Sequence, residues 1–505
     1  MSQRLDPISL QVLVGALRSA CEEMGAVLIR SSRSANIKER RDCSTAIFDP
    51  SGELVMQAEH IPVHLGSMPD AVAAVLDFDQ HRGDLWVLND PYAGGTHLPD
   101  ITLISPVFAP GADRPIAYAA SRAHHADVGG PTPGGMPADS TRLDQEGIVI
   151  PPTRADDDVL RELAGRMRGA EERLADLRAQ RAANLTGERR LGELAKSSGA
   201  AGLAAGMAEI LDYAERRTRA ALAALPDGVY AAEDVLEGGR DGSRELRLRL
   251  RATIRGDALR LDFDGSEPQV AGNLNCPLSV TRSAAFFAVR ALTDPDAPPS
   301  AGAHRPIEVA APPGSLLNAQ PPAAVAAGNV ETSSRVADLV IAALAGAVPA
   351  PAQGQGTMNN LTLAGEGWTY YETVGGGQGA CPDADGPSAV HVAMSNTLNT
   401  PVEALETEYP LRVRELALRR GSGGIGRHTG GAGTVRELEA LAAMDFSLIT
   451  ERRLHPPRGR GGGGDGAPGR NLLNGQELPP KCSGRLAPGD RLRIETPGGG
   501  GHGSA

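Results

Sequence analysis

The sequence predicts an α+β protein of several domains, with antiparallel and mixed sheets on either side of a central helical segment. Three observations predict it: leucines at helical spacing in a charged stretch at 155–225, alternation of apolar residues with arginine at 245–254, and short strand-like runs between glycine-rich turns from 350 onward. Because 505 residues exceed the ~100–200 of one domain, we expect an α+β region at 1–150, a helical segment at 151–225, an α+β region at 226–350 and a glycine-rich, β-dominated region at 351–505.

The first element is expected to be a helix over residues 9–31. Apolar side chains recur there at three- and four-residue steps, and Ser9 can cap the helix. Residues 63–76 predict a loop followed by a helix. Further along the chain, helical spacing recurs at 281–292 and 333–349.

Two hairpins are predicted in the N-terminal region. Segments 43–48 and 53–58 flank the turn Asp-Pro-Ser-Gly, and segments 101–109 and 115–123 flank a second turn. Pro106 cannot donate a backbone hydrogen bond, so we expect the strand that contains it to lie at a sheet edge or to carry a bulge.

The histidines are concentrated in one part of the chain. Six of the eleven fall between residues 60 and 125, namely His60, His64, His81, His97, His124 and His125. Aspartates lie among them or close by, namely Asp42, Asp90, Asp100 and Asp127. Imidazole and carboxylate groups are common ligands of divalent metals. The region therefore predicts a metal site, although any single member can equally be a surface histidine or a turn-forming aspartate.

The second hairpin is expected to bring three of these side chains together. Pro99 excludes a helix interior, so His97 and Asp100 lie on an extended loop that enters the first strand. With the turn centred near residue 112, Asp100 stands opposite His124, and directly opposed residues have Cβ atoms ~5 Å apart. Two imidazoles and a carboxylate in this arrangement suit Zn, Mn or Fe(II), with one position open for water or substrate.

The first hairpin predicts a similar arrangement at its open end. With the turn at 49–52, Asp42 falls opposite Glu59 and next to His60. Both arrangements assume a pairing register that the loop length alone does not fix.

Several common chemistries are excluded by missing motifs. The chain has no GxxxxGK[ST] phosphate loop, only three lysines, and no GxSxG nucleophile elbow. A GxGxxG occurs at 421–426, but no predicted helix follows it, so a dinucleotide site is not expected. The glycine clusters at 375–379, 461–464 and 498–501 are interpreted as tight turns between strands in preference to anion-binding loops.

Composition excludes further classes of protein. A net charge of −12 with 16 aromatic residues argues against nucleic-acid binding, and no run of ~18 apolar residues predicts a membrane span. The first residues lack the basic-then-apolar pattern of a secretion signal. The five cysteines form no CxxC pair, which is typical of a reducing compartment. We therefore expect a cytoplasmic protein.

Several segments, in order along the chain, resemble the hydantoinase B/oxoprolinase family. In the N-terminal region they are ERRDCSTAIFD (39–49), NDPYAGGTHLPD (89–100), SRAHHADVGG (121–130) and DLRAQRAAN (176–184). Later segments are DFDGS (262–266), GNVETS (328–333), YETVGGGQGA (371–380), NTLNTPVEALE (396–406), GSGGIGR (421–427) and TPGGGGHG (496–503).

The resemblance implies the metal-bearing subunit of an ATP-dependent hydrolase that acts on a small cyclic amide such as a hydantoin, 5-oxoproline or a lactam. It implies a separate A-type subunit that binds ATP and Mg, in a complex expected to be a heterotetramer. A subunit of an acetone- or acetophenone-type carboxylase is the alternative, because those enzymes are related to the same family.

The resemblance also implies which residues hold the metal and which assist catalysis. Similar proteins hold one divalent metal with an Asp of the ERRD segment, the His and Asp of HLPD and the first His of AHHAD. At the matching positions these are Asp42, His97, Asp100 and His124. Asp127 or His125 would then act as a general base or orient the attacking water.

Overall fold

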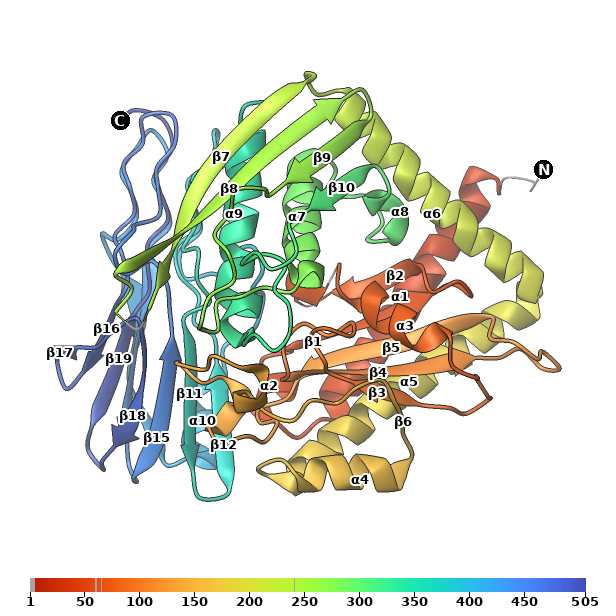
Figure 1. Ribbon diagram of the computed structural model, residues 1–505, viewed down its shortest axis with the longest axis horizontal. Coiled ribbons are helices and arrows are strands. Elements are labelled where there is room, and N and C mark those ends of the chain that lie inside the picture. Colours follow the sequence, from red (N-terminus) through yellow and green to blue (C-terminus); the bar gives the residue numbers. More distant parts are fainter. Residues whose placement is uncertain (1–4, 60, 65, 240) are drawn as a thin grey trace.

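The computed structural model describes residues 5–59, 61–64, 66–239 and 241–505 (Figure 1). The described residues form sheets of six, four, four and five strands, with helices packed on and between them. The predicted α+β class, with its mostly antiparallel sheets and central helical segment, is confirmed. None of the helices in this part of the chain is long and apolar enough to cross a membrane.

The N-terminal sheet has the strand order β2-β1-β5-β4-β3-β6. Its strands are β1 (Cys43–Phe48), β2 (Leu54–Glu59), β3 (Trp86–Leu88), β4 (Asp100–Val107), β5 (Ala117–His124) and β6 (Thr153–Arg154). Helices α1 (Pro7–Ser31) and α5 (Ala170–Ser198) cover one face, and α3 (Met68–Leu76) packs on the other. Because both faces are covered, β4 and β5 are buried at every residue.

Helix α1 begins two residues earlier than expected. Its cap is Asp6 and not Ser9, because Asp6 Oδ1 accepts hydrogen bonds from the backbone N–H groups of Ile8 and Ser9. Pro7 occupies the first turn, where its missing N–H costs nothing.

The expectation for Pro106 is wrong, because β4 lies inside the sheet between β5 and β3. The short strand β3 pairs only with Thr102, Leu103 and Ile104, so it ends before it reaches Pro106. On the other side, Pro106 stands opposite Tyr118 without a break in register. A proline is tolerated here because β4 has no neighbour on the β3 side at this point.

The middle of the chain is helical and then β, as predicted. Its helices are α4 (Asp157–Gly165), α6 (Ala200–Ala223), α7 (Leu278–Thr293), α8 (Ala301–His304) and α9 (Ser333–Leu344). The second sheet has the order β10-β9-β8-β7, from β7 (Gly228–Gly238), β8 (Arg244–Arg255), β9 (Ala258–Asp262) and β10 (Ile307–Ala310). Helices α7 and α9 pack beside this sheet (Figure 1) around a hydrophobic core that takes residues from Ile61 to Ile449.

The C-terminal part adds two sheets, with orders β12-β11-β15-β18 and β13-β14-β19-β16-β17. The strands of the first are β11 (Asn360–Gly365), β12 (Trp368–Glu372), β15 (Met444–Ile449) and β18 (Lys481–Leu486). Those of the second are β13 (Leu411–Arg419), β14 (Gly433–Ala440), β16 (Arg470–Leu473), β17 (Gln476–Glu477) and β19 (Arg491–Glu495). The short helices are α2 (Ala35–Lys38), α10 (Val402–Glu408), and the single turns η1 (Pro62–His64), η2 (Pro133–Gly135), η3 (Leu143–Gln145) and η4 (Gly328–Thr332).

Most of the glycine-rich tracts form a close-packed group of extended segments near the C-terminus (Figure 1). Gly499 shows the arrangement, since its N–H donates to the Gly431 carbonyl at 2.9 Å and its own carbonyl accepts from the Gly424 N–H at 2.8 Å. The interpretation as tight turns is wrong at 375–379 and 498–501, where the backbone is extended and bonds to other segments. Glycine is required there for closeness, because a Cβ on Gly499 would lie 2.0 Å from the Gln378 carbonyl oxygen.

We predict that Gly499→Ala lowers the free energy of unfolding by about 1–3 kcal/mol, because the added methyl group must push apart packed backbone segments. Gly192→Ala is the matched control, since that glycine lies in α5 with nothing within 4 Å of the added Cβ. The control should be neutral or up to about 1 kcal/mol more stable. Chemical denaturation of both variants measures this, and equal stabilities would refute the close-packing argument.

Candidate functional site

A small buried cavity of about 20 Å³ lies where the N-terminal sheet meets η4 and the C-terminal part. That volume is enough for about one water molecule or ion. The acidic and imidazole side chains that line the cavity are Asp42, His64, His97, Asp100 and His124. The structure thus brings together all four predicted metal ligands and adds His64.

Strand pairing explains how these side chains meet. Asp100 stands directly opposite His124 in the β4–β5 ladder, which confirms the predicted register of the second hairpin. His97 lies one turn before β4, where its carbonyl accepts a hydrogen bond from the Asp100 N–H at 3.1 Å. The His124 N–H in turn donates to the Asp42 carbonyl at 3.1 Å, so the residue that precedes β1 is held beside the end of β5.

The expected pairing of Asp42 with Glu59 is wrong. In the β1–β2 ladder Glu59 stands opposite Ser44, a shift of two residues. The turn runs from Asp49 to Glu53, one residue longer than expected, and a bulge between Ile47 and Phe48 adds the second residue. His60, the expected neighbour, lies outside the described residues.

Asp100 is the centre of the cluster. Its Oδ2 atom lies 3.5 Å from His64 Nε2 and 3.6 Å from His97 Nε2, and it accepts a hydrogen bond of 2.6 Å from Thr96 Oγ1. Asn329 Nδ2 donates to the same oxygen at 3.3 Å. Two ligand atoms on one tetrahedral zinc stand roughly 3.3 Å apart, so these separations are close to those that a shared cation would impose.

The protonation states suit cation binding. Burial would raise the pKa of Asp100, but the nearby His97 and His64 outweigh it and hold the pKa well below its usual value. Burial lowers the pKa of His124 strongly and that of His64 more mildly, so both imidazoles are neutral near pH 7. Burial, with Asp100 nearby, raises the pKa of Asp42 to about 7.

Two of the imidazoles have one ring nitrogen engaged and the other open. His64 Nδ1 lies 2.9 Å from Ser44 Oγ, and His124 Nδ1 lies 3.1 Å from Asn36 Nδ2. Within the described part of the chain, Nε2 of both rings is buried without a hydrogen-bond partner. A buried nitrogen left open in this way is expected where an absent cation would bind.

The donor groups are assembled but not closed around one point. No three His, Cys, Asp or Glu side chains of the described residues are gathered tightly enough to count as a formed metal site. The residues therefore fit a divalent metal in donor type, charge and cavity size, and small side-chain movements would have to complete the coordination.

Two residues from distant parts of the sequence complete the walls of the cavity. The ring of Tyr371 in β12 stacks on the His124 ring with centroids 4.4 Å apart, and its hydroxyl donates to Asn360 Oδ1 at 2.7 Å. Asn329 comes from η4, a single π-helical turn, and π turns occur frequently at functional sites. Sequence patterns gave no sign of either role, although both residues lie in segments that resemble the family motifs.

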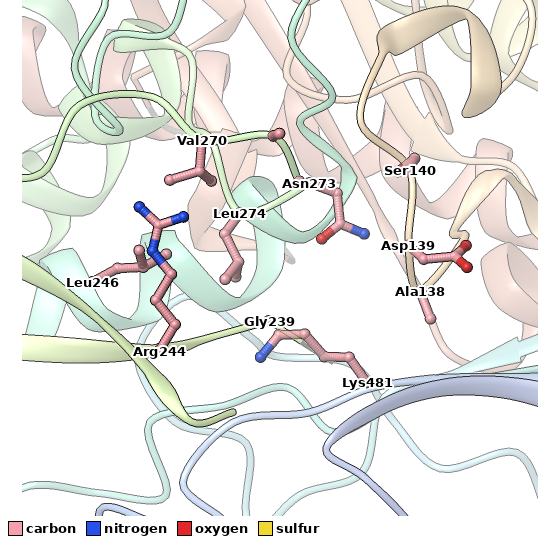
Figure 2. A pocket seen from close by; sticks show the side chains of 12 residues that line it. Ala138, Asp139, Ser140, Gly239, Arg244, Leu246, Val270, Asn273, Leu274 and Lys481 are labelled. Atoms are coloured by element: carbon pink, nitrogen blue, oxygen red, sulfur yellow. The ribbon is translucent and has the colours of Figure 1, made fainter. Parts of the chain in front are cut away.

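The turn η4 is hydrogen-bonded to a segment that lines a second and larger pocket. The Gly328 N–H donates to the Asn273 carbonyl at 2.9 Å, and Thr332 Oγ1 donates to the Leu274 carbonyl at 2.6 Å. Asn273 and Leu274 line a pocket of about 290 Å³ (Figure 2), whereas Asn329 lines the cavity. Residues of η4 line the cavity, and the segment that is hydrogen-bonded to η4 lines the larger pocket.

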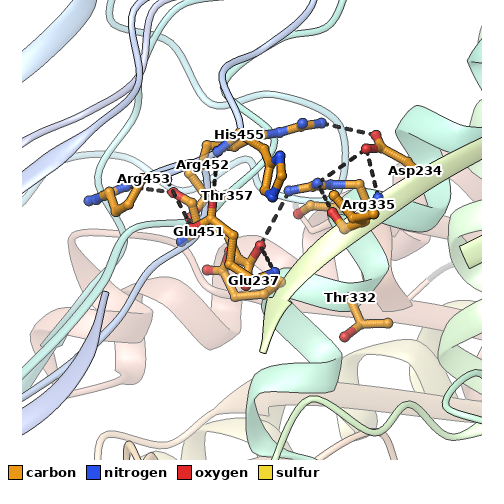
Figure 3. A network of polar contacts seen from close by, with 12 residues as sticks. Asp234, Glu237, Thr332, Arg335, Thr357, Glu451, Arg452, Arg453 and His455 are labelled. Atoms are coloured by element: carbon orange, nitrogen blue, oxygen red, sulfur yellow. Dashed lines mark hydrogen bonds and ion pairs between the residues drawn. The ribbon is translucent and has the colours of Figure 1, made fainter. Parts of the chain in front are cut away.

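A buried network of ion pairs holds this part of the molecule together (Figure 3). Lys481 Nζ lies 2.7 Å from Glu451 Oε1, and Arg335 Nη2 lies 3.4 Å from Glu451 Oε2. Arg452 Nη2 lies 3.3 Å from Asp234 Oδ2. Burial would raise the pKa of Glu451, but Lys481 and Arg335 outweigh it and lower the pKa. Because Arg335 lies in the first turn of α9, which directly follows η4, the network anchors that turn to β7 and to the C-terminal sheets.

The two predicted catalytic residues lie elsewhere. His125 Nε2 lies 2.9 Å from Gln180 Oε1 of α5, on the other side of the sheet from His124. The Asp127 carboxylate accepts hydrogen bonds from backbone N–H groups of Gly129 and Gly134 and pairs with Arg168 at 3.2 Å. Neither side chain lines the cavity, so their placement gives the catalytic assignment no support.

Comparison with known proteins agrees with the resemblance seen in the sequence. The family model described as hydantoinase B/oxoprolinase matches residues 6–505. A 5-oxoprolinase of Dictyostelium discoideum is 38% identical over all of this chain, which spans only 41% of that protein. The crystal structure of an ATP-dependent caprolactamase from Pseudomonas jessenii is 30% identical with a TM-score of 0.93, over 99% of this chain and 92% of the other. An acetone carboxylase structure shares the fold at 18% identity and a TM-score of 0.87, over 99% and 76%.

We predict that Glu331→Gln reduces the loss of stability between pH 5 and 8. Burial, with Glu451 nearby, raises the pKa of Glu331 from 4.5 to about 7. The folded protein therefore keeps a proton that the unfolded chain loses above pH ~4.5, so the free energy of unfolding falls as the pH rises to 7 and then levels off. The difference corresponds to about 3 kcal/mol, which glutamine would remove.

Chemical denaturation at several pH values tests this, with the exposed Glu366→Gln as the control. In the control, the free energy of unfolding should fall with pH as steeply as in the unchanged protein. Some slope should remain in Glu331→Gln, because burial also raises the pKa values of Asp42 and Glu146 to about 7. An unchanged slope would show that Glu331 titrates normally in the folded chain.

Proposed function

The chain belongs to the hydantoinase B/oxoprolinase family, and on that premise we propose that it is the metal-bearing subunit of an ATP-dependent cyclic-amide hydrolase. The observation that supports the proposal is the cavity that gathers two acidic and three imidazole side chains around a space for one ion. The substrate class would be a small hydantoin, 5-oxoproline or lactam.

The residues proposed to hold the metal are Asp42, His97, Asp100 and His124, with His64 as a fifth donor. When bound there, a divalent cation (Zn, Mn or Fe) would supply Lewis-acid polarisation of an oxygen atom. The protein contributes a carboxylate at Asp100 that stays ionised and imidazoles at His64 and His124 that stay neutral. Tyr371 stacks on the His124 ring and would help to fix its orientation.

ATP would be bound by a partner. The chain has no phosphate-binding loop, and it spans about two fifths of the 5-oxoprolinases that it matches. We propose that a separate A-type subunit supplies the ATP and Mg site, and that the two subunits form a heterotetramer. Phosphorylation of the amide oxygen by the partner would make the amide carbon electrophilic enough for attack by water.

A carboxylase subunit is the second candidate. The likeness to acetone carboxylase, at 18% identity, extends to the fold alone. The caprolactamase is more similar both in sequence and in structure, and it matches this chain over nearly its whole length. That difference favours hydrolysis over carboxylation.

We predict that His97→Ala and His124→Ala each remove bound metal and abolish turnover while the fold is retained. Each imidazole is one of a few donors in the cavity, and even the loss of a residue that only supports a ligand costs ~10–100-fold in metal affinity or activity. Asp42→Asn should have an intermediate effect, since an amide oxygen can still coordinate but carries no charge.

Elemental analysis of the purified variants, with circular dichroism for the fold, measures this. The matched control is His125→Ala, because His125 is the adjacent imidazole and lies against α5. Metal loss in the His125 variant alone would place the site on the other side of the sheet. Full metal retention in His97→Ala, His124→Ala and Asp42→Asn would refute the site.

The purified chain alone should hydrolyse no ATP, and addition of the co-expressed A-type partner should bring ATPase activity that depends on the cyclic amide. Phosphate release is the measurement, and size-exclusion chromatography of the pair shows whether the subunits associate. Robust ATP hydrolysis by the single chain, or a pair that elutes as two separate proteins, would contradict the two-subunit arrangement.

A further inference from the structure

The larger pocket lies where β7 ends, β8 begins and β18 begins, against the loop at 270–274. Its volume of about 290 Å³ suits a small organic molecule, whereas the cavity of about 20 Å³ holds no more than a water or an ion. A cyclic amide therefore cannot occupy the cavity as it stands, but it fits the pocket. The segment 273–274, which lines the pocket, is joined by hydrogen bonds to η4, whose Asn329 lines the cavity.

Arg244 gives the pocket one positive group at its rim. Along β8 the side chains alternate, and the outward positions carry Arg247, Arg249 and Arg251. Arg244 falls on the opposite face, with Leu246, so its guanidinium group is directed toward the pocket (Figure 2). One Nη atom of Arg244 donates to Glu267 Oε1 at 3.4 Å, so most of the N–H donors of Arg244 remain for a ligand.

Lys481 gives the pocket a second positive group, and this one is buried. Only 3% of its side chain is exposed, and Nζ donates to the Glu237 carbonyl at 2.6 Å and to Glu451 Oε1 at 2.7 Å. An ammonium group has three N–H donors. Two are used on the protein side, which leaves the third for a group in the pocket that Lys481 lines.

Asn273 adds a hydrogen-bond acceptor between these cations. Its Nδ2 donates to the Pro137 carbonyl at 2.6 Å, which turns Oδ1 toward the side of the pocket where Arg244 and Lys481 lie (Figure 2). The Asp139 carboxylate points away on the opposite side (Figure 2). Leu246, Val270 and Leu274 provide the apolar surface.

We propose that this pocket binds a small organic carboxylate that carries an N–H group next to its acid function. Arg244 and Lys481 would hold the carboxylate, Asn273 Oδ1 would accept from the N–H, and the apolar side chains would contact the carbon skeleton. The idea that the ligand is a cyclic amide bearing a carboxylate, or the amino acid formed by its ring opening, rests on the proposed function. The preference for a carboxylate rests on the pocket alone.

The test is calorimetric titration of the full chain with three matched compounds. L-5-oxoproline has both the carboxylate and the ring N–H, 2-pyrrolidinone lacks the carboxylate, and cyclopentanecarboxylate lacks the N–H. For a ligand of this size we expect a Kd of roughly 0.1–1 mM for 5-oxoproline, with each of the other two at least about fivefold weaker. Equal binding of 2-pyrrolidinone, or no binding of 5-oxoproline, would overturn the proposal.

Variants place the binding in this pocket. Arg244→Gln should weaken 5-oxoproline about five- to tenfold, and Val270→Phe should block it by filling the pocket. Arg255→Gln is the matched control, because Arg255 is an exposed arginine at the far end of the same strand, on its outward face. Undiminished binding to both pocket variants would overturn the proposal.

The outcome separates this proposal from the proposed function. Pocket-specific binding of 5-oxoproline without its hydrolysis in the presence of the partner would leave the pocket in place and count against the substrate assignment. If Arg244→Gln hydrolyses 5-oxoproline at low substrate concentration as efficiently as the unchanged protein does, the proposed function is supported and the pocket takes no part in the reaction.

Discussion

The antiparallel pairing of β4 with β5 is the constraint on which the candidate site depends. It sets Asp100 opposite His124, and the backbone bond from His124 to Asp42 extends the same ladder to the residue before β1. Three short segments are thereby fixed by main-chain hydrogen bonds and not by flexible side chains. A shift of one residue would turn His124 toward α5 and His125 toward the cavity. Because both faces of the sheet are packed against other elements, such a shift is disfavoured, and the same packing keeps the cluster in place.

Burial then gives each side chain of the cluster its charge state. In the absence of water, ionisation survives only where opposite charges or hydrogen bonds surround it, as they do at Asp100. The same burial keeps His124 neutral and raises the pKa of Asp42 to about 7. The ionised Asp100 beside the neutral rings of His64 and His124 suits the binding of a cation.

The sequence predicted the helices and both hairpins, and strand pairing brought His97, Asp100 and His124 together, because periodicity and pairing are local properties. Asp42 as a ligand was implied only by the resemblance to the family. It failed where extra residues change the register, because a longer turn and the bulge at Ile47 and Phe48 together displace Glu59 from Asp42. His64 was considered only as one member of a cluster, since its place depends on the turn η1. The roles of Tyr371 and Asn329 were not predicted, because both reach the cavity from segments more than 200 residues away in the chain.

The glycines also show that local sequence patterns do not predict contacts between distant segments. Turn rules interpret glycine through positive φ, yet Gly377, Gly430 and Gly499 are required because another backbone occupies the place of a side chain. Such backbone contacts connect segments that are far apart in the chain, and the sequence patterns of strands and turns do not predict them. Gly328 is the instance nearest to the site: a Cβ there would lie 1.8 Å from the Asn275 carbonyl. That close approach lets η4 press against the 273–276 segment and present Asn329 to Asp100, so one glycine couples the wall of the larger pocket to the centre of the cluster.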